Sequence, residues 1–163
     1  MGSEMCIRDR RYGARIVDVS NKRYTPPDNL LFSELPRSIM DGFETARNRN
    51  PLHRDWADIQ LPIPVRVSNV GLDCTPFLYN TPNYVEITGQ SVRKESIVVL
   101  PKTHMKPYSA NTFETAVSET PPIEKIRLVM IPDGGISRIT SKITLTEHLI
   151  TAAAEKYQSL SNT

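Results

Sequence analysis

Thirteen prolines divide this chain of 163 residues into short segments. Each proline lacks an amide hydrogen and fixes its own φ angle, so it interrupts a helix and is poorly tolerated inside a hydrogen-bonded central strand. Between the prolines, valine, isoleucine and threonine are frequent, and these residues favour strands. The distribution therefore predicts a protein of strands and loops rather than a bundle of helices.

Segments of alternating apolar and polar residues indicate where the strands lie. We expect strands over residues 15–20, 57–61, 65–73, 84–88, 96–100, 113–117, 123–131 and 136–143. The apolar phase slips at Ser68-Asn69, which predicts a β-bulge. Segment 123–131 is apolar on both faces, as in a central strand. The glycine-rich turn at 132–135 predicts that this strand and segment 136–143 form an antiparallel hairpin.

The two ends of the chain differ from the middle. Residues 1–10 resemble translated adaptor or vector sequence, and we expect a non-native leader there. Residues 11–143 would then form one antiparallel sandwich. Residues 144–163 begin with the spacing of a capping box and continue with apolar residues three and four apart, which predicts an amphipathic C-terminal helix over residues 145–160.

Composition limits the classes of function. Apolar residues make up 39% of the chain and charged residues 23%, a balance typical of a soluble globular domain. The formal net charge of +2 gives no reason to expect a nucleic acid or an anionic membrane as partner. No apolar run approaches the roughly 18 residues of a membrane-spanning helix. We expect Cys6 and Cys74 to be free thiols and the protein to be cytoplasmic.

The most concentrated run of charged residues lies between Met40 and Trp56, the only tryptophan. The run contains Asp41, Glu44, Arg47, Arg49, His53, Arg54 and Asp55. Apolar residues at both ends suggest that the segment is anchored to the core and presents its charges to a ligand. We expect Phe43 and Trp56 to be core residues. The alternative is a surface loop crossed by salt bridges.

This segment carries a resemblance to the allantoicase family. Asp41-Gly-Phe-Glu-Thr45, followed by Arg47 and by His53-Arg-Asp-Trp56, resembles the family signature. Further pieces that resemble the family follow in the same order at residues 26–31, 73–82, 100–103 and 126–139, so the similarity spans about residues 13 to 140. The chain departs from the family pattern at Phe43, where the family has tryptophan, and at Leu78-Tyr79, where it has a Lys-Gly pair. Arg54 is inserted between His53 and Asp55.

The resemblance implies a fold, an activity and a partner. The fold is a jelly-roll sandwich similar to galactose-binding-like domains. The activity is hydrolysis of allantoate, a small molecule, to ureidoglycolate and urea, a step of purine metabolism and allantoin degradation. Members of the family usually carry two such repeats, whereas this chain holds one. We therefore expect a fragment of a longer enzyme that pairs with a second repeat, a divergent paralogue, or a homo-oligomer of single repeats.

Allantoate carries one carboxylate and two ureido groups on the same carbon. Cleavage of a C–N bond requires a proton for the leaving urea nitrogen and an activated water. We assign Glu44 and His53 as general acid and base, with Asp41 and Asp55 orienting them. The fork of an arginine suits a carboxylate, and we assign Arg47 and Arg138 to it, with Arg49 as the reserve. Asn80 and Asp133 are the candidates for the ureido groups.

Each assignment has a structural alternative. Asp41 could cap a turn, Asp133 could shape the hairpin turn, and Arg138 could pair with a carboxylate on a neighbouring strand. His53 could be an ordinary surface histidine. We identify no cofactor motif. Glu44, His53 and Asp55 leave room for a divalent metal, although their spacing matches no zinc signature.

A second class of function stays open at this point. The same sandwich without a catalytic site would be a galactose-binding-like module for a small polar ligand. Leu78 and Tyr79 favour this alternative because they replace a cation and a flexible backbone position. The charged segment 41–55 favours the enzyme.

Overall fold

The computed structural model describes residues 3–7, 13–21, 25–116 and 120–145. Strands dominate these residues, and the only helices among them are two short 3-10 helices, η1 and η2. The elements are β1 (Ser3–Cys6), β2 (Arg15–Val19), η1 (Pro27–Leu31), η2 (Ile39–Asp41), β3 (Phe43–Glu44), β4 (Asp55–Asp73), β5 (Tyr84–Ser91), β6 (Ser96–His104), β7 (Ala110–Glu114), β8 (Ile123–Ile131), β9 (Gly135–Ile136) and β10 (Arg138–Leu145). The expected mainly-β fold is confirmed.

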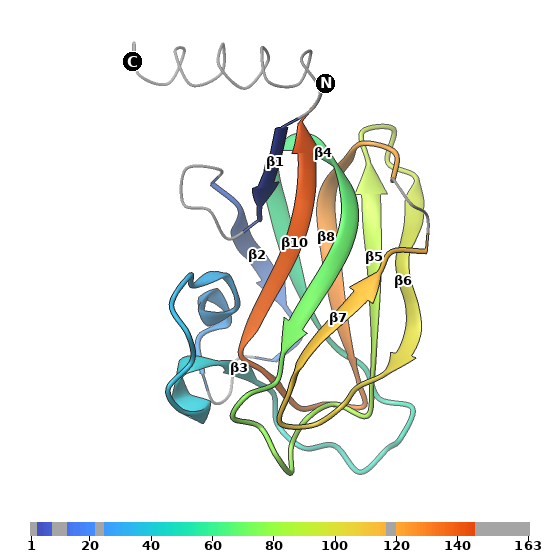
Figure 1. The fold of residues 1–163 in the computed structure, drawn as a ribbon. Helices are drawn as coiled ribbons and strands as arrows, with labels where there is room; N and C mark the ends of the chain where they lie inside the picture. Colours follow the sequence, from blue (N-terminus) through green and yellow to red (C-terminus); the bar gives the residue numbers. More distant parts are fainter. Residues whose placement is uncertain (1–2, 8–12, 22–24, 117–119, 146–163) are drawn as a thin grey trace.

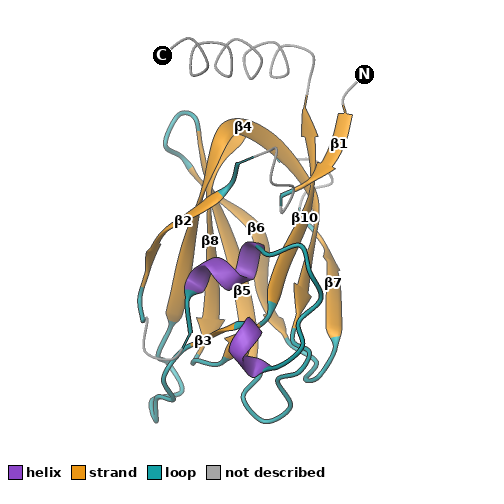
Figure 2. Ribbon diagram, turned by 90° about the vertical axis from the view of Figure 1, so that its left-hand side faces the viewer, coloured by secondary structure: helices purple, strands orange, loops and turns teal. Residues whose placement is uncertain are grey.

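The strands form two antiparallel sheets that face each other (Figures 1 and 2). One sheet has the order β2-β4-β8-β5-β6, and the other has the order β1-β10-β4-β7. Strand β4 belongs to both sheets, and its first half lies in one and its second half in the other. The inward residues of both sheets, such as Ile59, Leu72 and Leu128, are at most 2% exposed and form the core. This is a jelly-roll sandwich.

Strand β4 is longer than the sequence predicted. We expected two strands separated by Pro62 and Pro64, but residues 55–73 form one continuous strand of 19 residues. Its register with β8 jumps from Gln60 to Val65, so the prolines fall where β4 leaves one sheet for the other. A missing amide there removes no bond of the β4–β8 ladder. The predicted bulge is confirmed, because Asn69 and Val67 face consecutive residues of β10 and leave Ser68 as the extra residue.

The predicted hairpin of β8 and β10 is wrong. Strand β8 lies between β4 and β5, as expected of a central strand, so neither of its edges is free for a return strand. The chain instead turns at 132–134 and crosses to the facing sheet. There β10 pairs with β1 and β4, and it buries Ile139 and Ile143 from the second side of the core. On the way, β9 pairs with β3.

The two ends of the described chain lie side by side. Residues 3–6, which we set aside as part of a leader, pair with β10, and the following Ile7 is 1% exposed. The origin of residues 1–10 stays a prediction. Strand β10 continues to Leu145, so residues 144 and 145 are strand and not the start of a helix. The remainder of the predicted helix lies outside the described residues. Among the residues that are described, no helix is long and apolar enough to cross a membrane.

Candidate functional site

Three loops meet at one end of the sandwich, at the bottom of Figure 1. They are residues 45–54 between β3 and β4, residues 74–83 between β4 and β5, and the turn 132–134 between β8 and β9. The amide of Thr45 donates to the carbonyl of Gly134 (2.9 Å), and the amide of Gly135 donates to the carbonyl of Asn80 (2.8 Å). We call this region the loop end. It contains most of the charged residues that the sequence singled out.

Glycines allow the three loops to come this close. Gly134 has a φ of +138°, and a Cβ at this position would lie 2.6 Å from the carbonyl oxygen of Asn80. A Cβ on Gly42 would lie 2.8 Å from the ring of Phe77, which is fully buried, and Gly135 packs against the same ring. Gly42, Gly134 and Gly135 lie in segments that resemble the family, and they have a structural role here. Without side chains, they let three segments pack together around the ring of Phe77.

Two of the predicted site residues are in direct contact. The amide nitrogen Nδ2 of Asn80 donates to Oε1 of Glu44, and both side chains are half-buried. The backbone amide of Glu44 donates to Oγ1 of Thr25 (2.9 Å), which fixes the start of the loop. Thr25 carries no sequence signal that links it to Glu44, because it lies 19 residues away in a proline-rich segment. The oxygen Oε2 of Glu44 has no protein partner among the described residues.

Asp133 holds the loop 45–54 against the turn. Its Oδ2 accepts a hydrogen bond from the backbone amide of Asn48 (2.6 Å), across 85 residues of sequence. The turn 132–134 therefore lies between the loop 45–54 on one side and Asn80 on the other. One oxygen of the Asp133 carboxylate is thus bonded to the loop 45–54 and not within its own turn. Asn48 is a further residue that the sequence did not single out.

His53 and Asp55 form a pair at the start of β4. Nε2 of His53 lies 3.2 Å from Oδ1 of Asp55, and the side chains are 33% and 2% exposed. The hydroxyl of Ser20 donates to the same Oδ1 (2.8 Å) and accepts from the amide of Trp56 (2.8 Å). The second oxygen, Oδ2, is buried and has no hydrogen-bond partner in the part of the chain that is described. Because Nε2 faces the carboxylate, Nδ1 is the nitrogen left to accept a proton.

The two arginines of the loop 45–54 are exposed. Arg47 and Arg49 lie between Glu44 and His53 in the sequence. Neither guanidinium has a hydrogen bond or an ion pair with any residue that the structure describes. Both are therefore available to an anionic ligand that approaches the loop end.

Arg138 has a different environment from the one we expected. It is 3% exposed, and its Nε and Nη1 donate to the backbone carbonyls of Glu34 (2.9 Å), Asn29 (3.1 Å) and Asp41. Its guanidinium also lies 5.6 Å from the ring of Phe32. Arg138 therefore fastens the segment of η1 and η2, seen beside β3 in Figure 2, to the sandwich.

The carboxylate of Asp41 lies in the same segment. Its Oδ2 accepts from the amide of Arg37 (2.8 Å), so it closes the turn around η2. The structure brings together Glu44 with Asn80, and His53 with Asp55, but it places Asp41 and Arg138 on the η1–η2 side. Among the described residues, no group of three or more His, Cys, Asp and Glu side chains could hold a metal ion.

Phe43, Trp56 and Cys74 are not equally buried in the fold. Phe43 is fully buried, as predicted, but Trp56 is half-buried on the outer face of its sheet, where its ring lies 4.1 Å from the guanidinium carbon of Arg127. The strand alternates, so Asp55 and Ala57 point inward and Trp56 points outward. Cys74 is a free thiol, as predicted. Burial raises the pKa of Cys74 to about 12, Asp73 adds to this effect, and a hydrogen bond with Thr81 opposes it.

Known proteins with similar sequences show which family this chain resembles. Residues 6–143 match the family model described as Allantoicase repeat. The probable allantoicase of Nocardia farcinica is 35% identical over 127 residues, and the allantoicase of Saccharomyces cerevisiae is 28% identical over 137 residues. Each alignment covers 78% of this chain but only 38% and 39% of those proteins. The chain thus spans about two fifths of the length of the curated relatives it matches.

Solved structures give the same result. The crystal structure of allantoicase from Saccharomyces cerevisiae aligns with a TM-score of 0.78 at 28% identity, over 86% of this chain and 43% of that chain. The family 32 carbohydrate-binding module from C. perfringens NanJ, in complex with galactose, aligns with a TM-score of 0.64 at 14% identity, over 86% of this chain and 99% of that chain. At such low identity, the second similarity shows the fold alone.

Proposed function

The chain belongs to the allantoicase family, and we propose that it is one repeat of an enzyme that hydrolyses allantoate to ureidoglycolate and urea. The observation that carries this proposal is the match to the Allantoicase repeat over residues 6–143. That match includes all three loops of the loop end. Because the chain covers 38–41% of its relatives, we propose that a second repeat or a second copy of the chain completes the enzyme.

In this proposal, His53 moves the proton. Asp55 is buried and held by Ser20, so it fixes the imidazole with Nε2–H toward the carboxylate and leaves Nδ1 as the proton acceptor. Nδ1 takes a proton from the attacking water, and the resulting imidazolium gives it to the departing urea nitrogen. The neighbouring carboxylate stabilises the imidazolium, as in other histidine–carboxylate pairs.

Glu44 is the second acid–base candidate. Asn80 donates to its Oε1 and so holds the carboxylate in one orientation. Oε2 is then the acceptor for a ureido N–H or for a proton released during the reaction. Asn80 positions Glu44, and Asp133 positions the loop that carries the arginines through its bond to Asn48.

Arg47 and Arg49 are the proposed cations for the substrate carboxylate, because they are exposed on the loop between Glu44 and His53. We propose that Arg138 holds the η1–η2 segment rather than the substrate, since it is buried and donates to backbone carbonyls. A divalent metal stays a prediction from the sequence, and His53 and Asp55 are the two candidate ligands that lie together. The cytoplasmic location also stays a prediction.

Colorimetric measurement of urea released from allantoate tests this function. We expect release by the full-length protein that contains this chain, and little or none after His53→Gln, with the fold checked by circular dichroism. Glu114→Gln, on exposed strand β7, is a control that should keep full activity. A folded full-length protein that releases no urea would contradict the proposal.

One observation favours a second candidate function, a binding module for a small polar ligand. Three large apolar side chains are exposed near the loop end: Leu78 at 49%, Tyr79 at 88% and Tyr108 at 57%. Exposed tyrosine rings are suited to stacking on a sugar. Calorimetric titration with galactose, together with Tyr79→Ala, tests this candidate. Galactose binding that Tyr79→Ala abolishes, without urea release, would support the module, and urea release without galactose binding would exclude it.

A further inference from the structure

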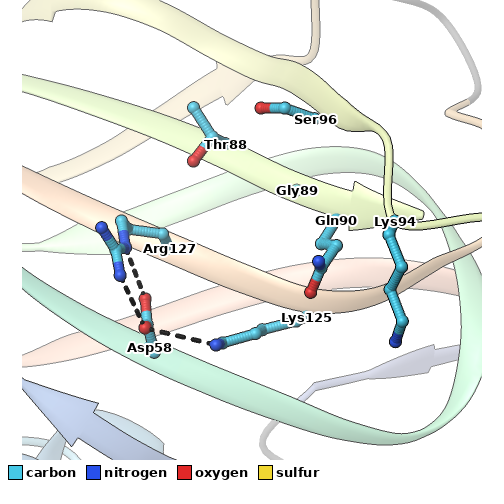
Figure 3. Close-up of a pocket in the computed structure, with 8 residues that line it drawn as sticks. All are labelled: Asp58, Thr88, Gly89, Gln90, Lys94, Ser96, Lys125 and Arg127. Atoms are coloured by element: carbon cyan, nitrogen blue, oxygen red, sulfur yellow. Dashed lines mark hydrogen bonds and ion pairs between the residues drawn. The ribbon is translucent and has the colours of Figure 1, made fainter. Parts of the chain in front are cut away.

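A cavity opens on the outer face of the five-stranded sheet, away from the core (Figure 3). Its volume is about 260 Å³. Its lining comes from four adjacent strands, β4, β8, β5 and β6. The polar side chains of the lining are those of Asp58, Thr88, Gln90, Lys94, Ser96, Lys125 and Arg127. None of these residues belongs to the loop end, and Asp58 points to the opposite side of β4 from Asp55.

The floor of the cavity is a buried carboxylate that holds two cations. Asp58 is 2% exposed, and its two oxygens accept from Nε (2.7 Å) and Nη2 (2.9 Å) of Arg127. Nζ of Lys125 lies 3.5 Å from Oδ2 of the same carboxylate. The ring of Trp56 lies against the guanidinium. The hydrogen bond with Asp58 is also the main reason that the pKa of Arg127 is raised.

This arrangement fixes two cations while leaving them accessible. Arg127 is 44% exposed and Lys125 is 36% exposed. Nη1 of Arg127 has no partner among the described residues. With one carboxylate against two cations, the floor carries one positive charge in excess. At the rim, Lys94 pairs with Glu124 and adds no net charge. Asp18 faces Asp58 from the neighbouring strand β2, and its charge is the smallest of the influences on the pKa of Arg127.

Burying a carboxylate is costly, and exposed ion pairs on a sheet contribute little stability. A role in positioning explains the arrangement better: Asp58 and Trp56 hold the guanidinium in one orientation, so less rotamer freedom is lost when a ligand binds. The neighbouring hydroxyls of Thr88 and Ser96 and the amide of Gln90 can then donate to polar atoms of the same ligand.

We propose that this cavity binds a small organic anion through a carboxylate or phosphate group. The free edge of Arg127 and the ammonium of Lys125 would hold the anionic group. The hydroxyl and amide side chains would hold the polar remainder of the ligand. The proposal does not depend on the hydrolysis of allantoate.

Trp56 provides the assay, because it is the only tryptophan of the chain and contacts Arg127. The probes are succinate, inorganic phosphate and the uncharged succinamide, titrated at constant ionic strength. We expect a saturable change in tryptophan fluorescence with at least one anion and none with succinamide. A response to succinate alone indicates a carboxylate ligand, and a response to phosphate alone indicates a phosphate ligand. Changes in backbone amide NMR chemical shifts measure binding in the same titration independently of fluorescence.

Two variants with the same change of charge make the test specific. Lys125→Gln removes a cation of the cavity without touching Trp56, and we expect the Kd to rise about tenfold. Lys142→Gln removes an exposed lysine from β10 on the other sheet, and we expect no change in Kd. Equal affinity in wild type and Lys125→Gln, or no saturable response to either anion by fluorescence and NMR, would overturn the proposal.

Discussion

At the scale of single residues, Arg138 has a structural role that the sequence alone does not reveal. From the sequence, Arg138 is assigned to the substrate carboxylate, because the fork of an arginine suits that group. In the fold, its donors are used by backbone carbonyls 97 to 109 residues away, and no periodicity in the sequence can show such contacts. Four of the predicted site residues do lie together in the structure: Glu44 contacts Asn80, and His53 contacts Asp55. Ser20 and Asn48 carry no local signal.

The substitution Arg138→Met should destabilise the fold. It leaves several carbonyls without their donor inside the protein, and each such group costs about 1–3 kcal/mol. We therefore expect the free energy of unfolding to fall by about 3 kcal/mol, measured by urea denaturation. Arg49→Met, on the exposed loop, should change it by less than about 0.5 kcal/mol. Unchanged stability with a raised KM for allantoate would instead return Arg138 to substrate binding.

Cys74 gives a prediction for alkaline pH. Its thiol has a pKa of about 12 in the fold and an ordinary value of 9.0 when unfolded. Below pH 9 both states hold the proton, but above it the unfolded state loses the proton first. Stability should therefore fall between pH 9 and 12, by up to about 1.4 kcal/mol per pH unit. Cys74→Ala should lack this contribution, and identical slopes in urea denaturation of both proteins would contradict the argument.

At the scale of elements, the alternation of apolar and polar residues identified most strands, because one face of each strand is buried and the other is not. Local sequence patterns did not predict which strands pair when the partners lie far apart in the chain. Pro62 and Pro64 suggested a break, but the sandwich needs one strand to cross between its sheets there. The turn after β8 suggested a hairpin, but β4 and β5 already occupy both edges of β8. Pairing partners are a property of the whole fold, which local spacing cannot specify.

The loop 45–54 should open when its contact with the turn is removed. Asp133→Ala deletes the acceptor of the Asn48 amide, a charge-assisted bond. We expect trypsin to cleave after Arg47 and Arg49 about tenfold faster, because the energy needed for local opening falls. Glu95→Ala, in the exposed turn between β5 and β6, should leave the cleavage rate unchanged. Equal rates in Asp133→Ala and wild type would show that the loop is held by other contacts.

At the scale of the molecule, the sandwich keeps two polar regions apart. The three loops meet at one end around Phe77, and the cationic cavity lies on the outer face of one sheet. Both arise because β4 alternates along its length: Asp55 points into the loop end and Asp58 points outward. The family match covers both regions, and the relatives are more than twice as long as this chain.

We propose that the residues of the loop end carry out the release of urea. The most direct measurement is the kcat of urea release from allantoate for Glu44→Gln and His53→Gln in the full-length protein. We predict that each lowers kcat by about 10²- to 10⁴-fold, as expected for loss of a general acid or base, while Glu114→Gln keeps the wild-type kcat. Wild-type kcat in both loop-end variants would contradict the account.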